Sequence, residues 1–518
     1  MENGEWALDH WVAHSPFSIL HFPLLIEFTM LSRAGLLQEL SSRTFDVLII
    51  GGGITGAGIA RDAAMRGLAV ALVDKGDFAS GTSSRSSRLI HGGVRYLEHG
   101  HLHLVFEASA ERRRLLRIAP HLVHPLAFIW PAYRGQRLPL WKLRAGLALY
   151  DALSLFRNIG RHARLGAEEV LEAEPALRRD DLRGGVRYFD AATDDTRLTL
   201  ANVLDARRHG ATVANHVAFV GVGKASEGVR VARVEDALTG DRSEVRALAF
   251  VNASGPWSDA VQHLETAIGT ASVRGSKGAH IAVPRSRVGN TAAVTMLHPR
   301  DGRVLFTLPS GTQTVVGTTD SYTDVSPDEV RASETDVAYL LEGVNAFFPN
   351  AGLERADVVA AWAGIRPLLP AKKSSVSASR EHRIASGGQS VAVTGGKLTT
   401  YRVMAREVVD AVQEMLERPR TPAPTGDEPI GGGDVLANGD SPEIVSGLPY
   451  RMSAMQRAID EEMACTLGDL LIRRTHIAYE TRDNGRAAAR RVAAHLGWDG
   501  REVERYDAEV DRIFRIDA

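Results

Sequence analysis

The sequence has very little cysteine, because Cys465 is the single one among 518 residues. A lone cysteine excludes a disulfide within the chain, and it excludes a zinc or iron–sulfur site built from several cysteines. Net charge is also nearly absent, at -2 with histidine neutral, whereas a protein that binds nucleic acid usually has a basic excess. We therefore expect no metal site and no nucleic-acid partner.

A long uninterrupted apolar run is missing as well. The most apolar stretch near the N-terminus, residues 17–31, is interrupted by His21, Pro23 and Glu27, so it does not fit a membrane span. The acidic residues before it do not fit a signal peptide, which needs positive charge there. We expect residues 1–42 to be a poorly ordered extension, with translation from Met30 as our preferred explanation and a membrane-touching segment as the second.

What the sequence does contain is enough apolar residues for several cores. The hydrophobic content is 44% and the charged content is 24%, which is typical of a globular protein. At this length two or three domains are expected.

The clearest motif is a glycine-rich turn that follows a short apolar run. Gly51, Gly53 and Gly56 have the spacing G-x-G-x-x-G, in which the glycines allow a tight turn, the approach of a pyrophosphate and close packing of the next helix. Residues 69–73 predict a second parallel strand, and Asp74 follows it where a carboxylate accepts from ribose hydroxyls. The unit predicts a dinucleotide site, although its spacing does not distinguish NAD from FAD.

Two later segments have the same character. Residues 247–251 predict a buried strand that ends in the small-residue turn 252–257. Residues 390–400 predict a strand, a glycine turn and then a helix that begins at Tyr401, so a second helix N-terminus faces an anionic or electron-rich ring edge. Between them, residues 271–349 alternate as the strands of an antiparallel sheet with one face over a pocket.

A polar loop after Asp74 is dense in serine and glycine. Loops of this length are usually functional, and Ser83 and Ser84 supply hydroxyls suited to phosphate or ribitol oxygens. A surface linker is the alternative, but the arginines and His91 of this segment make a purely solvated linker a poorer explanation.

Eight short motifs together resemble those of the FAD-dependent, aerobic-type glycerol-3-phosphate dehydrogenase family. They occur in the family's order over roughly residues 43 to 515, and the fourth is the most specific. The motifs are GGGITGAG, NASGPW, TGGKLTTYR, TSSRSSRLIHGGVRYLEHG, KGAHIAVP, GTTD, AGIRPLLP and LGDLLIRRT.

The resemblance implies an α/β fold in three parts. These are a discontinuous, Rossmann-like FAD-binding domain similar to glutathione reductase, a mixed or antiparallel sheet that caps the substrate, and an α-helical C-terminal domain. The expected boundaries are 43–125, 186–260 and 362–417 for the FAD-binding domain, 126–185 and 261–361 for the cap, 418–442 for a linker and 443–518 for the helical domain.

The resemblance also implies roles for individual residues. Arginine forks match phosphate oxygens, and a histidine suits a base near neutral pH, which favours His280 or His91. Residues implied to hold FAD are Gly51, Gly53, Gly56, Asp74, Ser83, Ser84, Gly255, Gly396, Lys397, Leu398 and Thr399. Residues implied to bind the substrate are Arg95, Tyr96, Arg366 and Arg380, and the catalytic candidates are His91, His280, Arg366 and Lys397.

The implied reaction is oxidation of sn-glycerol 3-phosphate to dihydroxyacetone phosphate, by hydride transfer from C2 to N5 of FAD. The resemblance suggests a membrane quinone as acceptor, with oxygen left open, and a cytoplasmic protein attached peripherally to the inner face of the cell membrane; a homodimer is one option. Two other functions stay open. One is an FAD-dependent oxidase of another small hydroxy or amino acid, and the other is a non-catalytic, nucleotide-binding redox sensor.

Overall fold

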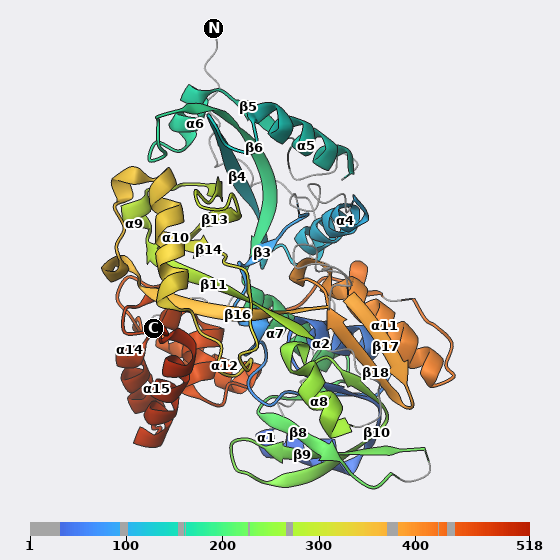
Figure 1. Ribbon diagram of the computed structural model, residues 1–518. Helices are drawn as coiled ribbons and strands as arrows, with labels where there is room; N and C mark the ends of the chain where they lie inside the picture. Colours follow the sequence, from blue (N-terminus) through green and yellow to red (C-terminus); the bar gives the residue numbers. More distant parts are fainter. Residues whose placement is uncertain are drawn as a thin grey trace, which may run out of the picture.

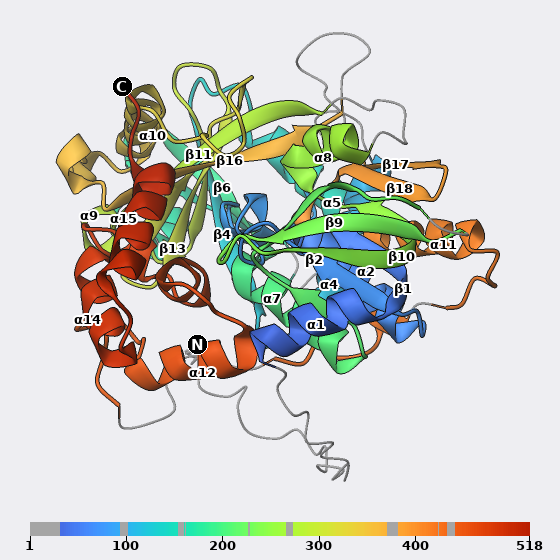
Figure 2. The same cartoon turned by 90° about the horizontal axis from the view of Figure 1, so that it is seen from below.

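The computed structural model describes most of the chain in two sheets and a set of C-terminal helices. The C-terminal helices lie against both sheet-containing parts (Figures 1 and 2). The described residues are 32–93, 102–153, 160, 162–225, 228–265, 273–369, 382–422, 424–432 and 441–518.

The first sheet has a parallel centre built from apolar runs that are buried on both faces. Leu48 and Ile49 in β1 are fully buried, as expected of a strand with helices on either side of it. The strand order is β17 (His382–Gly387), β18 (Ser390–Gly395), β10 (Arg242–Asn252), β1 (Thr44–Ile50), β2 (Val70–Val73) and β7 (Thr212–Ala214). In addition, β9 (Arg230–Asp236) pairs with β10, and β8 (Val217–Val222) pairs with β9.

Helices cover this sheet (Figure 1). The central one, α2 (Ile54–Met65), packs between α7 (Asp195–Arg208) and α11 (Tyr401–Met415). Asp194 caps α7 by accepting from the backbone N–H of Arg197 at 2.9 Å, as aspartate commonly does at a helix start. The helix α8 (Ser258–Glu265) follows β10 and contacts β8.

The second sheet is mostly antiparallel and carries the other wall of the site. Its strand order is β15 (Ser321–Tyr322), β11 (Arg274–Pro284), β14 (Gln313–Gly317), β13 (Val304–Ser310), β12 (Ala293–Leu297), β4 (Val123–Tyr133), β6 (Leu182–Thr193) and β3 (Leu89–Ile90), with β16 (Ala360–Leu368) paired to β11 and β5 (Ala163–Leu165) to β6. The helices associated with it are α4 (Leu102–Ile118), α5 (Leu140–Leu153), α6 (Ala167–Ala173), α9 (Arg285–Val288) and α10 (Glu334–Phe347).

Two expected domain boundaries need correction. The boundaries at residues 186 and 362 cut through β6 and β16, and both strands lie wholly in the second sheet. Strand β3, in the middle of the most specific motif, also belongs to that sheet. An apolar strand in the sequence does not reveal which sheet it joins, because that choice depends on pairing with distant strands.

The C-terminal helices are α12 (Met452–Glu462), α13 (Ile477–Glu480), α14 (Arg486–Leu496) and α15 (Gly500–Phe514). The expected α-helical character of the C-terminal region is confirmed, and α15 buries Tyr506, Val510 and Ile513 at helical spacing. Residues Asp469–Arg474 form a π-helical turn.

The expectation of poor order for residues 1–42 is wrong for its last part. Helix α1 (Arg33–Ser42) buries Leu36 and Leu40 against the first sheet, and Arg33 forms an ion pair with Asp236 at 2.8 Å. Residues 1–31 lie outside the described part of the chain.

The expected linker 418–442 also packs on the first domain where it is described. Thr425 is buried. Arg61 donates to the carbonyl of Thr425 at 3.2 Å and to that of Glu428 at 3.1 Å. This segment is therefore fixed to the domain rather than free of it.

Truncating Leu40 should show that α1 belongs to the folded domain. Because its side chain is 1% exposed, we expect Leu40→Ala to lower the free energy of unfolding by about 3 kcal/mol. Denaturant unfolding measures the change, with the exposed neighbour Gln38→Ala as the control. Equal stability of the two variants would mean that α1 does not contribute to the core.

Candidate active site

A cavity of about 1570 Å³ lies between the two sheets. On one side it is bounded by the carboxyl ends of parallel strands, at Ile50, Val73, Ala253 and Gly395. On the other side it is bounded by residues of the second sheet. The carboxyl ends of parallel strands are where such folds bind their ligands.

The glycine turn between β1 and α2 leaves no room for side chains. Gly51 has φ 110°, and a Cβ there would lie 2.7 Å from the carbonyl oxygen of Ala253. A Cβ at Gly56 would overlap the carbonyl oxygen of Gly51. Gly53 caps α2 with extended backbone. The N–H of Ile54 donates to Ser83, and the N–H groups that follow it at the helix start are available to a pyrophosphate.

Asp74 ends β2 beside this turn. Its carboxylate accepts from the backbone N–H groups of Gly52 at 2.7 Å and Gly76 at 2.8 Å. Burial raises the pKa of Asp74 to about 6. Together the turn, the helix start and the carboxylate fit the ADP half of a dinucleotide, and the remaining length of the cavity gives room for the other half.

The loop between β2 and β3, residues 74–88, is called the cofactor loop below. In its short 3-10 turn η2 (Thr82–Ser84), Ser83 lines the cavity and accepts from the N–H of Ile54 at 3.0 Å. Ser84 does not line the cavity, because its hydroxyl turns back to the carbonyl of Gly81 at 3.3 Å. The implied contact of Ser84 with the cofactor stays a prediction.

Two other residues implied to hold the cofactor lie behind the wall. Gly56 packs beneath the glycine turn. Thr399, in η6 (Leu398–Thr400), accepts from the N–H of His91 at 3.2 Å and donates to its carbonyl at 3.3 Å. Thr399 thus ties the His91 segment to the start of α11. The implied residues that do line the cavity are Gly51, Gly53, Asp74, Ser83, Gly255, Gly396, Lys397 and Leu398.

His280 stands on the opposite wall, on β11. Its ring stacks on Trp362 of β16, with centroids 5.6 Å apart and an interplanar angle of 12°, and the two residues face each other in the strand register. Its Nε2 lies 2.9 Å from the hydroxyl of Ser87. Burial, followed by the charges of Arg366 and Arg88, lowers the pKa of His280 to about 3, so the ring is neutral at physiological pH.

Arg366 lies across Gly278 of the neighbouring strand, where any Cβ would overlap the guanidinium. Arg366 donates to the hydroxyl of Thr318 at 2.9 Å, and its Nη1 is 3.5 Å from the carboxylate of Asp320. Lys397 lines the same cavity at the N-terminal side of η6. Arg366 and the neutral imidazole of His280 therefore face the cavity from the second sheet, and Lys397 lines it beside the carboxyl end of β18 in the first sheet.

Three of the residues implied to bind the substrate, Arg95, Tyr96 and Arg380, lie outside the described residues. The chain enters both of these segments beside the site, since Gly93 and Leu368 line the cavity. His91 and Arg366 line it as well. The structure therefore brings together all four catalytic candidates.

Comparison with known proteins identifies this architecture. Residues 46–410 match the FAD dependent oxidoreductase family, and residues 426–503 match the C-terminal domain of alpha-glycerophosphate oxidase. The glycerol-3-phosphate dehydrogenase of Mycobacterium leprae is 35% identical over 534 residues, covering 92% of this chain and 90% of the relative. The chain belongs to the FAD-dependent glycerol-3-phosphate dehydrogenase family.

Other members support this membership. The aerobic glycerol-3-phosphate dehydrogenase of Staphylococcus saprophyticus is 38% identical over 395 residues, covering 76% of this chain and 71% of the relative. The crystal structure of the glycerol-3-phosphate dehydrogenase from Bacillus halodurans, complexed with FAD, superposes with a TM-score of 0.74 at 28% identity and covers 93% of this chain and 97% of that chain. The predicted family, its fold class and its FAD cofactor are confirmed, and the protein is an oxidoreductase.

Two residues that contact the predicted site residues were not themselves predicted from the sequence. Trp362 supports the His280 ring and Asp320 faces Arg366. Asp320 ends the motif GTTD, whereas Trp362 lies immediately before the motif AGIRPLLP. Their contacts depend on the pairing of β11 with β14 and β16, which no local pattern encodes.

Proposed function

We propose that this flavoenzyme oxidises sn-glycerol 3-phosphate to dihydroxyacetone phosphate. The observation that supports this most is the second-sheet wall of the cavity, where the charge of Arg366 acts on neutral His280, while the cation Lys397 lines the same cavity beside the carboxyl end of β18. An alcohol that carries a phosphate needs a base for its hydroxyl proton and cations for its negative charges. Relatives that align with most of this chain are named for the same substrate.

The roles of the chain's own residues follow from their positions. FAD, when bound, supplies at N5 the acceptor for the hydride that leaves C2. His280 takes up the hydroxyl proton at Nε2, the nitrogen that meets Ser87. Arg366 and Lys397 stabilise negative charge on the C2 oxygen. We assign the phosphate to Arg366 together with Arg95, Tyr96 and Arg380, which stay predictions.

Turnover with an artificial electron acceptor tests the substrate. Glycerol 3-phosphate should be oxidised, and glycerol should react on the order of 100-fold or more slowly in kcat/KM, because it lacks the phosphate that the arginines bind. Equal activity with the two alcohols would contradict a phosphate clamp. Faster oxidation of an amino acid or of another hydroxy acid would replace the proposed substrate.

The pH dependence should reflect a neutral His280. The pKa of about 3 is below the ordinary value of about 6.5, so the ring stays unprotonated from about pH 5 to about pH 9. We expect the ratio of kcat/KM between wild type and His280→Gln to be constant over this range; using a ratio cancels the ionisation of the substrate phosphate. A ratio that declines below about pH 6.5 would show that His280 titrates normally.

We propose further that the electrons pass to a quinone while the protein lies on the inner membrane surface. No helix in the described ranges is long and apolar enough to cross a bilayer. Helix α5 instead turns outward Trp141, which is 65% exposed, and Leu149, with Lys142 and Arg144 between them. An exposed aromatic residue among basic ones suits an interface with anionic lipid.

Vesicle binding tests this surface. Trp141→Ala should reduce sedimentation with anionic vesicles by about tenfold and leave turnover with a soluble acceptor unchanged. The exposed Arg300→Ala, on another part of the second sheet, is the control. Unchanged vesicle binding by the Trp141 variant would exclude α5 as the attachment surface.

A further inference from the structure

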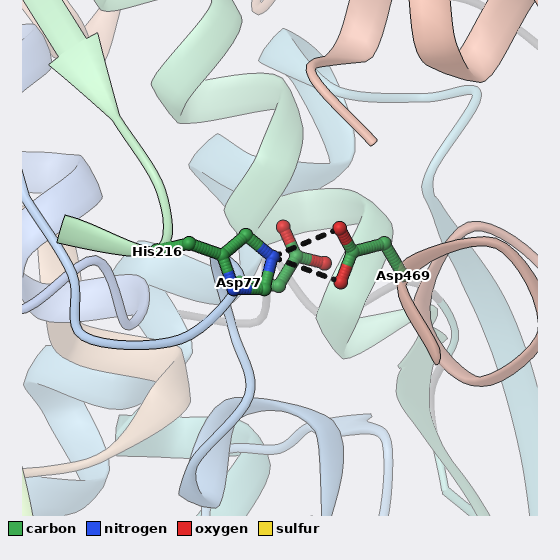
Figure 3. A group of neighbouring side chains, drawn as sticks. All are labelled: Asp77, His216 and Asp469. Carbon is green, nitrogen blue, oxygen red and sulfur yellow. Dashed lines mark hydrogen bonds and ion pairs between the residues drawn. The ribbon is translucent and has the colours of Figure 1, made fainter. Parts of the chain in front are cut away.

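The C-terminal domain contacts the cofactor loop through a buried group of charges (Figure 3). Asp469, on the π-helical turn, lies 3.0 Å from Nε2 of His216. Asp77 of the loop accepts from Arg473 at 2.7 Å and from Arg474 at 2.5 Å. The ligand atoms of Asp77, His216 and Asp469 lie within 4.8 Å of one another, a spacing that suits a metal ion.

The guanidinium groups decide how this group is interpreted. Arg473 also donates to Asp469 at 2.7 Å, so both buried carboxylates already have cationic partners from the protein. Buried carboxylates that are paired in this way need no further cation, and breaking one pair would be costly. We therefore interpret the group as an ion-pair network that fastens the C-terminal domain to the start of the cofactor loop.

A second contact lies at the other end of the cofactor loop, at Arg88. Nη2 of Arg88 lies 3.1 Å from Nδ1 of His476, and the Arg88 guanidinium lies over the ring of Tyr479, 5.0 Å from its centroid. Nε2 of His476 is 2.7 Å from the carboxylate of Asp194. Since Arg88 only donates and Asp194 accepts, His476 carries its proton on Nε2 and accepts at Nδ1.

The backbone of Arg88 needs such contacts. Its φ is 54°, in the left-handed region, which is unfavourable for a residue other than glycine. Tyr479 also bonds to the cofactor loop, which contains Arg88, because its hydroxyl donates to the carbonyl of Ser84 at 3.1 Å. The charged and titratable groups that face Arg88 are Asp194, Asp195, His280, Tyr450, His476, Tyr479 and Glu480.

Arg88 directly follows Ser87, which is the hydrogen-bonding partner of His280. The hydroxyl of Ser87 lies 2.9 Å from Nε2 of His280. The charges that act on His280 are those of Arg366 and Arg88, and both lower its pKa. A displacement of Arg88 would therefore change the orientation of Ser87 and the charge near the His280 ring together.

We propose that the C-terminal domain contributes to the active site, because His476 and Tyr479 of this domain are positioning residues for Arg88. Through Arg88 they keep Ser87 and His280 in the arrangement that proton uptake requires. The inference rests on the proposed function of His280. It gives the helical domain, which is distant from the glycine turn in the chain, a direct influence on the chemistry.

The test compares two substitutions of His476 in the full-length holoenzyme. His476→Phe keeps a ring but removes the acceptor for Arg88, and we expect FAD to remain bound while flavin reduction by saturating glycerol 3-phosphate slows about tenfold. With Arg88 displaced, the pKa of His280 should rise, since one of the charges that lower it is lost, so the fall in rate at low pH should begin at a higher pH than in wild type. His476→Asn, whose amide oxygen replaces Nδ1 as the acceptor, should restore most of the rate and the wild-type pH profile.

The matched control is Arg197→Gln. It breaks another ion pair between the first domain and the C-terminal helices, Arg197 to Glu462 at 2.7 Å, without touching Arg88. If Arg197→Gln loses the same rate and shows the same pH profile, the effect is general loosening of the interface and the proposal is wrong. An unchanged His476→Phe enzyme overturns it as well.

Two further outcomes are distinguishable. If the wild-type flavin is not reduced by glycerol 3-phosphate, the proposed function fails rather than this inference. If His476→Phe does not fold, Tyr479→Leu removes the ring beneath Arg88 and the bond to Ser84, and the same slowed reduction and altered pH profile are expected. A normal rate and profile in a folded Tyr479→Leu enzyme would contradict the proposal.

Discussion

A Gly56→Ala enzyme is expected to be purified without FAD. The added Cβ would overlap the carbonyl oxygen of Gly51, which is backbone and cannot rotate away, so either the turn or the start of α2 must shift. The same turn is fixed from the other side, since Gly51 packs against Ala253. We expect FAD affinity to decrease by about 100-fold or more, equivalent to about 3 kcal/mol.

The ratio of flavin to protein in the purified enzyme measures this effect. Gly146→Ala is the matched control, because Gly146 lies within α5 and a Cβ there meets no atom within 4 Å. That variant should retain the wild-type flavin content. Full flavin content in Gly56→Ala would mean that α2 can move away from β1 without loss of the site, contrary to the geometry described above.

Arg366→Ala is expected to keep its flavin and lose most of its activity. The residue is on β16 of the second sheet, away from the glycine turn, so FAD binding should be unaffected. Removing a partly buried cation that contacts an anionic substrate should lower kcat/KM for glycerol 3-phosphate by about 100- to 1000-fold, or about 3–4 kcal/mol. The loss should appear mainly in KM if the cation binds the phosphate, and mainly in kcat if it stabilises the C2 oxygen.

Arg303 provides a demanding comparison. It also lines the cavity, but its guanidinium donates to the backbone carbonyl of Asp320. Its charge therefore already has a partner in the protein. Arg303→Ala should cost less than about tenfold. If Arg366→Ala has kinetics like those of wild type, Arg366 does not contact the substrate and the cationic wall must be assigned differently.

How well the sequence predicted each feature depended on whether the feature is encoded locally. The turn at Gly51 to Gly56 and the carboxylate of Asp74 were predictable, because a strand, a tight turn and a helix start each depend on neighbouring residues. The boundaries at 186 and 362 were not, since the sheet that a strand joins is decided by distant partners.

The candidate site also combines features that neighbouring residues encode with features that depend on distant contacts. The motifs selected His280 and Arg366 by residue type, but the stack of Trp362 on His280 arises only when β16 pairs with β11. Ser84 and Thr399 were assigned to the cofactor because they lie in the right motifs. A motif does not say which way a side chain faces in a 3-10 turn, and both hydroxyls bond to backbone behind the wall.

Anaerobic reduction of the bound flavin by glycerol 3-phosphate tests the central claim most directly. The wild-type holoenzyme is mixed with the substrate in the absence of any acceptor, and the flavin absorbance and the dihydroxyacetone phosphate formed are measured together. We predict complete bleaching of the flavin with one molecule of product for each flavin reduced. A flavin that stays oxidised with glycerol 3-phosphate, while another hydroxy acid or an amino acid bleaches it, would contradict the proposed function.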